Sequence, residues 1–148
     1  MSAKVETQKH IHTVGSLIHN FVNDLLYRAD MHDYSKLQEP EASVFEVMTE
    51  RLKGSTYGSP EYAAMLAEMK PALDHHYANN RHHPEFHKDG VKGMSLLDLV
   101  EMLLDWKAAT LRHADGDIRK SIEINHKRFG FSEETKAILL NTVEEMGL

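Results

Sequence analysis

An imidazole and a carboxylate stand next to each other at His32 and Asp33. His10 precedes this pair by 22 positions, and several histidines and Asp105 follow it. Imidazole nitrogen and carboxylate oxygen are ligands that suit zinc, iron, manganese, nickel or cobalt. A structural zinc site would usually recruit thiolates, and the chain has no cysteine. These residue types therefore indicate a hydrolytic metal centre.

A second group of possible ligands is a run of histidines in the middle of the chain. Two adjacent pairs stand seven positions apart, so that four histidines fall within nine residues: His75, His76, His82 and His83. The run is internal and mixed with Asn and Arg, unlike an expression tag at a terminus. We expect at least two of the four to bind metal. The run by itself does not say which two.

Two further residues are placed by their spacing. At 100° per residue, His10 falls within about 80° of the centre of the apolar arc of its helix, whereas His12 and His19 fall outside it. A core histidine without a ligand role would show the same pattern. Lys36 follows Asp33 by three residues, where its ammonium could reach a phosphate oxygen, although an ordinary surface lysine has the same spacing.

Asp105 shares the polar face of its expected helix with Asp98, Glu101 and Arg112. An acidic stripe can line a site or simply face solvent, and spacing does not choose among the three carboxylates. Arg112 lies two turns beyond Asp105, from where it could bind a phosphate that the metal also contacts.

Length and charge limit the class of protein. A chain of 148 residues has the size of one domain, so we expect a single domain over residues 1–148. The net charge of -6 argues against an extended nucleic-acid surface. A polar N-terminus, the lack of an apolar run of roughly 20 residues and the lack of cysteine predict a soluble, cytoplasmic protein without a membrane partner. A homo-oligomer is left open.

The apolar spacing predicts helices throughout and no strand. The expected helices cover residues 4–29, 40–52, 59–77 with a kink or restart at Pro71, 95–113, 118–127 and 133–146. Gly54, Ser55 and Gly58 end the second helix, and Ser59 caps the third. Residues 79–93 have no apolar period and are expected to form the loop that carries function. The predicted fold is all-α, a compact bundle of about six helices.

Several faces of these helices are expected to point inward. Val14, Leu17, Ile18, Phe21, Val22 and Leu25 form the face of the first helix. Leu96, Val100, Leu103, Leu104 and Leu111 form that of the helix at 95–113, which Ser95 and Asp98 begin as a capping box. Ile138, Leu139 and Val143 form that of the last helix, with Ser132 as its cap and Gly147 at its end.

The order His10-x-x-x-Val14, His32-Asp33, a histidine group and Asp105 resembles the HD-domain superfamily of metal-dependent phosphohydrolases, over about residues 6–115. In that superfamily the His-Asp pair and the outer histidine and aspartate hold metal, and further histidines complete a second site. Carried over, the ligands are His10, His32, Asp33, His76, His82, His83 and Asp105, with Glu6 one turn before the first. Asp33-Tyr34-Ser35-Lys36 resembles a D-x-G-K step whose lysine contacts substrate phosphate, with serine here in place of glycine.

Longer segments resemble a family of small uncharacterised HD-like proteins from bacteria and their phages, for which no substrate is known. The matching segments are 28–37, 57–62, 80–85 and 101–109. They carry the resemblance over nearly the whole chain.

The function that the resemblance implies is hydrolysis of a phosphate ester, most simply of a nucleotide, by a nucleotidase or phosphodiesterase. One or two ions of Mn, Fe, Ni, Co or Zn, with Mg as another choice, would serve it. Asp33, Lys36 and Glu101 would be catalytic, and Lys36, Arg81 and Arg112 would bind the phosphate. Tyr77 could stack on a base, whereas Trp106 is better explained by core packing. The alternatives are a di-iron oxygenase of the inositol-oxygenase type and a non-catalytic module that binds a nucleotide or regulates a partner.

Overall fold

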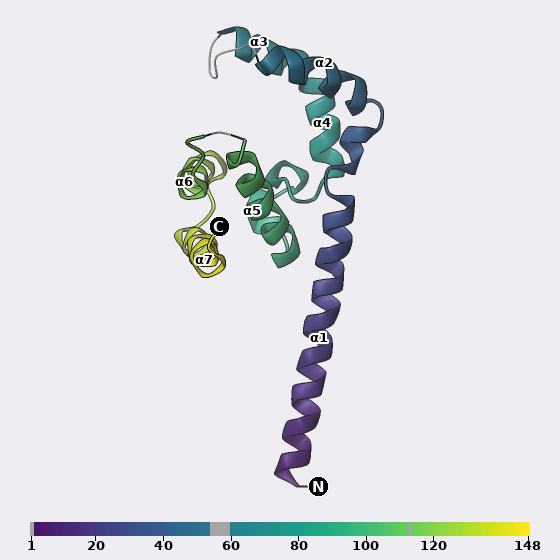
Figure 1. Cartoon of the computed structure of the whole chain (residues 1–148), viewed down its shortest axis with the longest axis vertical. Helices are drawn as coiled ribbons and strands as arrows, with labels where there is room; N and C mark the ends of the chain where they lie inside the picture. Colours follow the sequence, from purple (N-terminus) through teal and green to yellow (C-terminus); the bar gives the residue numbers. More distant parts are fainter. Residues whose placement is uncertain (1, 54–59, 113) are drawn as a thin grey trace. The chain divides into compact units, whose positions relative to one another are not determined.

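The computed structural model describes residues 2–53, 60–112 and 114–148 of the chain (Figure 1). The described residues form seven α-helices and three short 3-10 helices and contain no strand, which confirms the all-α prediction. Two compact units are formed by residues 1–32 and 33–148. The expectation of a single domain stays a prediction.

The first unit is a single long helix, α1 (Ala3–Met31), close to the predicted range of 4–29. None of its side chains is buried, and Val14, Leu17 and Ile18 are 39%, 63% and 56% exposed. The face is therefore uncovered within this unit, and its burial stays a prediction. The apolar period produces an amphipathic helix, but burial needs a second element, and this unit has none. His10 is likewise exposed within this unit, and its inward orientation stays a prediction.

The second unit begins with four helices. They are η1 (Tyr34–Leu37), α2 (Glu41–Lys53), α3 (Pro60–Glu68) and α4 (Lys70–Asn79). α2 contacts η1, α3 and α4, and a small apolar group of Met48, Met69 and Ala72 is buried among these helices. The predicted restart at Pro71 is confirmed, because the helix breaks at Met69 and Pro71 stands in the first turn of α4. The predicted break at Gly54, Ser55 and Gly58 and the predicted cap at Ser59 lie outside the described residues.

The predicted loop at 79–93 is confirmed as irregular chain with two single 3-10 turns, η2 (Pro84–Phe86) and η3 (Gly90–Gly93). Three helices follow: α5 (Leu96–Thr110), α6 (Ile118–Phe129) and α7 (Glu133–Met146). Ser95 and Asp98 form the predicted capping box. Ser132 caps α7, and Gly147 ends it in the left-handed conformation, also as predicted. His113, where the helix at 95–113 was expected to end, lies outside the described residues.

The main core is formed by α5, α6 and α7 together with η3. Its buried side chains are Val91, Met102, Leu103, Ile118, Ile122, Phe131, Leu139 and Val143. Trp106 packs against this core with its ring parallel to that of Phe129, at 6.4 Å between centroids, which confirms its role in packing.

The predicted inner faces of the last helices need correction. Leu96, Leu104 and Leu111 of the α5 segment are exposed, and so is Ile138 of α7. Asp98, which periodicity placed on the polar face, is fully buried. Its carboxylate is satisfied by its own helix N-terminus and by Arg81, and those contacts allow the burial that periodicity does not foresee.

Candidate metal centre

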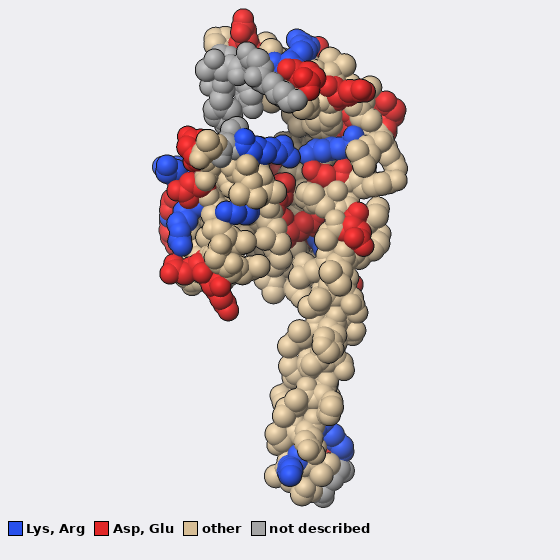
Figure 2. All heavy atoms as spheres, in the orientation of Figure 1, with Lys and Arg blue, Asp and Glu red and all other residues tan. Residues whose placement is uncertain are grey.

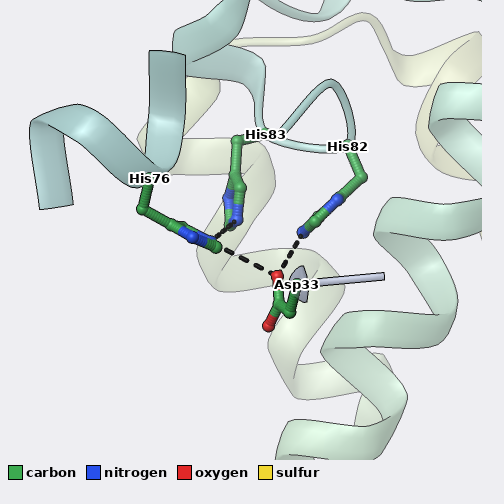
Figure 3. A group of neighbouring side chains, drawn as sticks. All are labelled: Asp33, His76, His82 and His83. Carbon is green, nitrogen blue, oxygen red and sulfur yellow. Dashed lines mark hydrogen bonds and ion pairs between the residues drawn. The ribbon is translucent and has the colours of Figure 1, made fainter. Parts of the chain in front are cut away.

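Four predicted ligands lie together in the second unit: Asp33, His76, His82 and His83 (Figure 3). Their ligand atoms are all within 4.8 Å of one another. Asp33 begins η1, His76 lies on α4, and the other two histidines lie in the loop after α4. The structure thus brings together residues that are up to 50 positions apart in the chain.

Asp33 has a left-handed backbone conformation, with φ of 56°. Aspartate is one of the few residues with a side chain that adopts this conformation readily. The turn comes directly after α1 ends and lets the chain enter η1. Asp33 then presents its Oδ1 atom to the histidines and its Oδ2 atom to Lys36.

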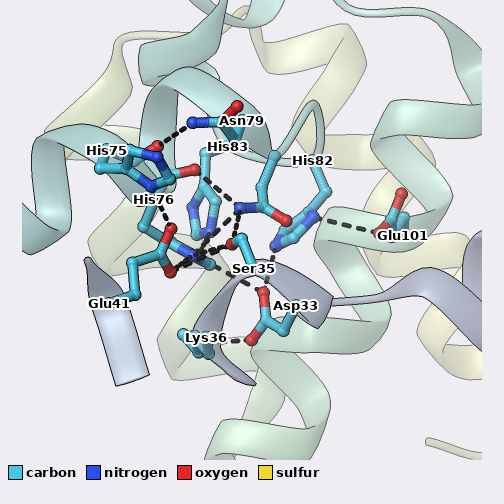
Figure 4. A network of polar contacts seen from close by, with 11 residues as sticks. Asp33, Ser35, Lys36, Glu41, His75, His76, Asn79, His82, His83 and Glu101 are labelled. Atoms are coloured by element: carbon cyan, nitrogen blue, oxygen red, sulfur yellow. Dashed lines mark hydrogen bonds and ion pairs between the residues drawn. The ribbon is translucent and has the colours of Figure 1, made fainter. Parts of the chain in front are cut away.

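His76 is held from behind by a buried carboxylate. Its Nδ1 atom is 2.9 Å from Oε2 of Glu41, whose side chain is fully buried at the start of α2 (Figure 4). The pKa of Glu41 is raised by burial, but hydrogen bonds from His75, Ser35 and His76 outweigh that effect and leave it below its usual value. An ionised carboxylate only accepts hydrogen bonds, so Nδ1 of His76 carries the proton.

The amide of Asn80 supports the same tautomer of His76. Its Nδ2 atom lies 3.1 Å from Nδ1 of His76, yet it also donates to Oγ of Ser35 at 2.7 Å and to the backbone oxygen of His76 at 2.8 Å. Those two shorter bonds use both hydrogens of the amide. The proton between His76 and Glu41 is therefore the imidazole's own, and Nε2 of His76 carries a lone pair.

His82 is held in the same way from the opposite side. Its Nδ1 atom is 3.1 Å from Oε1 of Glu101 on α5, and its side chain is 2% exposed. A proton on Nδ1 leaves Nε2 of His82 with the lone pair. Carboxylates that orient metal-binding histidines in this manner are common behind metal ions.

Two imidazole lone pairs therefore point at one carboxylate oxygen. Nε2 of His76 and Nε2 of His82 each lie 3.4 Å from Oδ1 of Asp33. Three atoms that carry lone pairs repel one another unless a cation lies between them. With bonds of about 2.0–2.1 Å, tetrahedral ligand atoms stand about 3.3–3.4 Å apart. The residues present thus fit a divalent transition metal.

His83 completes the cluster. Because Nε2 of His76 carries a lone pair, Nε2 of His83 donates the 2.9 Å hydrogen bond between the two side chains, and the ring of His83 is 4.2 Å from that of His82 between centroids. Burial and then the neighbouring imidazoles lower the pKa of His83 to about 3, against the effect of Asp105 and Asp33. A neutral imidazole is the form that binds metal.

Burial, followed by the charge of Lys36, also lowers the pKa of His76. Both His76 and His83 are therefore neutral at neutral pH, and His76 presents the lone pair of its Nε2 atom to Asp33.

The predicted phosphate-binding residues have different surroundings. Nζ of Lys36 is 2.6 Å from Oδ2 of Asp33 and is partly exposed, so a cation lies at the edge of the cluster. Arg81 instead makes two hydrogen bonds, of 3.2 and 3.1 Å, to the buried Asp98. Arg112 is exposed in the turn after α5. Of the three, only Lys36 is brought to the cluster by a contact that the structure shows.

Three predicted ligands remain. Asp105 lies on α5, and its charge acts on His83. His10 is an exposed residue of α1, and His32 ends the first unit, one peptide bond before Asp33. Their roles as ligands stay predictions from the resemblance.

Glu41, Ser35 and Asn80 are site residues that the sequence pattern did not reveal. Metal-binding histidines usually donate their second ring N–H to a carboxylate or carbonyl, and that general rule is the one signal that points to a residue such as Glu41. Nothing in the spacing distinguishes Glu41 from its acidic neighbours Glu39 and Glu46.

None of the helices in the described part of the chain is long and apolar enough to cross a membrane. Residues 2–145 match a family described only as a family of unknown function, DUF5662. No curated protein and no solved structure matches the chain.

Proposed function

This chain belongs to DUF5662, a family of unknown function, and we propose that it is a metal-dependent phosphohydrolase that cleaves a phosphate ester, most simply that of a nucleotide. The observation that carries the proposal is the convergence of His76 and His82 on Oδ1 of Asp33. Their tautomers are set by Glu41 and Glu101, an arrangement that supports the binding of a cation between them.

A bound divalent ion would supply two effects to hydrolysis: a lower pKa for water and charge compensation on phosphoryl oxygens. The reaction forms a bond between the water oxygen and phosphorus and breaks the ester bond from phosphorus to the leaving oxygen. The water loses a proton and the leaving oxygen gains one. The chain would contribute Asp33 and the histidines as ligands, and Glu101 as a positioning residue behind His82.

The position of the Lys36 ammonium supports phosphate as the chemical group that the site binds. This ammonium already contacts a carboxylate oxygen, Oδ2 of Asp33, and it sits 5.4 Å from the ring centroid of Phe45. Both residues line a groove of about 600 Å³, whose other walls are Leu37, Ala42, Glu46, Thr49 and Glu50. Phe45 is in turn 6.1 Å from the ring of His76. A phosphate at Lys36 and an apolar or aromatic group against Phe45 would fit a nucleotide-like ester.

The first experiment measures metal content by mass spectrometry and then screens for turnover. The purified protein is given manganese, cobalt, nickel or magnesium and tested against nucleotide mono-, di- and triphosphates and cyclic nucleotides. We expect bound metal and metal-dependent release of product. A protein that binds no metal and turns over no phosphate ester would contradict the proposal.

A matched pair of variants tests the assignment of the site. Asp33→Asn keeps the size of the side chain and tolerates the left-handed conformation, and it should lose metal and activity while keeping its helical content. Asp74→Asn is the control, because Asp74 also pairs with a lysine, at 2.6 Å from Nζ of Lys70, and its exposed side chain lies about 200° around α4 from that of His76. Activity that survives in Asp33→Asn would show that the cluster is structural.

Redox chemistry is the second candidate, because His76, His82 and Asp33 also form the set of two histidines and one carboxylate that many iron oxygenases use. Consumption of oxygen by the iron-loaded protein would favour it. Metal-dependent phosphate release without oxygen would favour hydrolysis.

A further inference from the structure

α1 presents an apolar face that nothing in its own unit covers. Its 29 residues include no buried side chain, and Ile11, Val14, Ile18 and Val22 are 62%, 39%, 56% and 43% exposed. The four residues recur at spacings of three and four and therefore lie on one side of the helix. Helices of this kind gain most of their stability from packing such a face. A face of this length suits another helix of similar length.

The charges of α1 are confined to its two ends. Residues 10–23 contain no Asp, Glu, Lys or Arg. Lys4, Glu6 and Lys9 stand before this segment, and Asp24, Arg28 and Asp30 stand after it. Figure 2 shows the helix tan along most of its visible length, with blue side chains at its N-terminal end.

The charges at one end of α1 are opposite in sign to those at the other end, so they would attract each other if two copies of the helix paired antiparallel. About the middle of α1, near residue 17, Lys4 mirrors Asp30, Glu6 mirrors Arg28, and Lys9 mirrors Asp24. The members of each mirrored pair have opposite signs and lie within about 80° of each other around the helix axis. Lys4 with Asp30 and Glu6 with Arg28 lie toward the two edges of the apolar face, whereas Lys9 points away from that face and pairs with Glu6 of its own helix at 3.3 Å. Flanking residues of the same side face each other between antiparallel helices. A parallel copy would instead place Lys4 beside Lys4 and Glu6 beside Glu6.

We propose that α1 pairs with α1 of a second copy of this chain, in antiparallel orientation, through the face that includes Ile11, Val14, Ile18 and Val22. Charge complementarity selects the second copy and its direction, since antiparallel pairing brings together opposite charges at both edges of the face, Lys4 with Asp30 and Glu6 with Arg28. The proposal is independent of the metal centre and of the proposed activity.

The oligomeric state of the full chain in solution tests the pairing. We expect a dimer by light scattering and sedimentation. Ile18→Lys should weaken it roughly a hundredfold, because both copies lose a buried isoleucine and gain a buried charge. Ile124→Lys is the matched control, an isoleucine of α6 that is 65% exposed, and should leave the dimer unchanged. Circular dichroism confirms that both variants keep their helices.

The orientation is tested by disulfide formation, for which the chain is well suited because it has no cysteine. Glu6→Cys and Arg28→Cys variants are prepared separately, mixed to exchange subunits and oxidised. Antiparallel pairing gives a cross-link between the two variants and little with either alone. A monomer, a dimer insensitive to Ile18→Lys, or cross-linking of each variant to itself would each overturn the proposal.

Discussion

Glu41 is the residue on which the geometry of the centre depends most, although it is not itself among the clustered ligands. It accepts hydrogen bonds from His75 at 2.7 Å, from His76 at 2.9 Å and from Ser35 at 3.0 Å, and its side chain is fully buried. Because it fixes the proton of His76 on Nδ1, it decides which nitrogen faces Asp33. In the proposed metal centre its role would be to position the ligand His76.

Replacing Glu41 should therefore weaken metal binding without removing a ligand. We expect Glu41→Gln to lower the affinity for cobalt or zinc by about 10–100-fold, because the amide cannot accept from both histidines and carries no charge. Competition with a coloured chelator measures the affinity.

Glu39→Gln is the matched control, an exposed residue two positions earlier. Its affinity should equal that of the unaltered protein. The visible spectrum of bound cobalt separates a positioning role from a structural one, since only altered ligation changes it. Equal affinities for Glu41→Gln and Glu39→Gln would remove Glu41 from the site.

At the scale of elements, α5 carries the residues that approach the centre from one side. Glu101 contacts His82, and Asp105 acts on His83, while Met102 and Leu103 of the same helix are buried in the core. The direction of α5 is set at its N-terminus. There Oδ2 of Asp98 accepts from the backbone N of Ser95 at 2.8 Å, and the same carboxylate binds Arg81 from the histidine loop.

The two halves of the α5 capping box should differ in their contribution to stability. Ser95→Ala removes one bond to the backbone and should lower the free energy of unfolding by about 1 kcal/mol. Asp98→Ala should lower it by about 2–3 kcal/mol, because hydrogen bonds to a charged group are stronger and Arg81 also loses its partner. Urea unfolding of both variants measures the difference.

Asp89→Ala serves as the reference for this comparison, since Asp89 begins η3 without a side-chain cap bond. It should be close to neutral. Equal losses in Ser95→Ala and Asp98→Ala would mean that the contact with Arg81 contributes nothing to the fold.

At the scale of the whole molecule, the packing of neutral histidines makes the metal-free protein sensitive to acid. The pKa of His83 is lowered to about 3 and that of His76 is lowered as well, both chiefly by burial. In the unfolded chain both return to about 6.5. Between these values the unfolded state binds protons that the folded state does not, so stability falls as the pH drops.

We therefore expect the chelator-treated protein to lose stability steadily as the pH falls from about 6.5 toward 3. Urea unfolding at a series of pH values measures the slope. His83→Asn should reduce it, because one of the histidines that stays neutral in the fold is absent. A slope that is the same in this variant would show that His83 titrates normally in the folded protein.

The sequence alone predicts the local features of this protein. The apolar period predicts the helices, and Pro71 predicts the point where one of them restarts. Ser95 and Ser132 predict where two helices begin, and Gly147 predicts where the last one stops. Each of these features depends on neighbours within about one turn. The His-Asp pair and the histidine run were also visible as candidate ligands. Their residue types alone suggested a metal.

Only the tertiary structure decided which candidates meet and which faces are covered. Asp33 and His76 are 43 positions apart, and no local rule brings their atoms to 3.4 Å. Glu41 approaches His76 only because α2 packs on α4. Asp98 is buried although periodicity places it on the polar face of its helix, because Arg81 forms hydrogen bonds with its carboxylate. The apolar face of α1 shows what periodicity does not determine. Periodicity specifies which side chains share a face, but burial depends on a partner that a helix's own sequence does not contain.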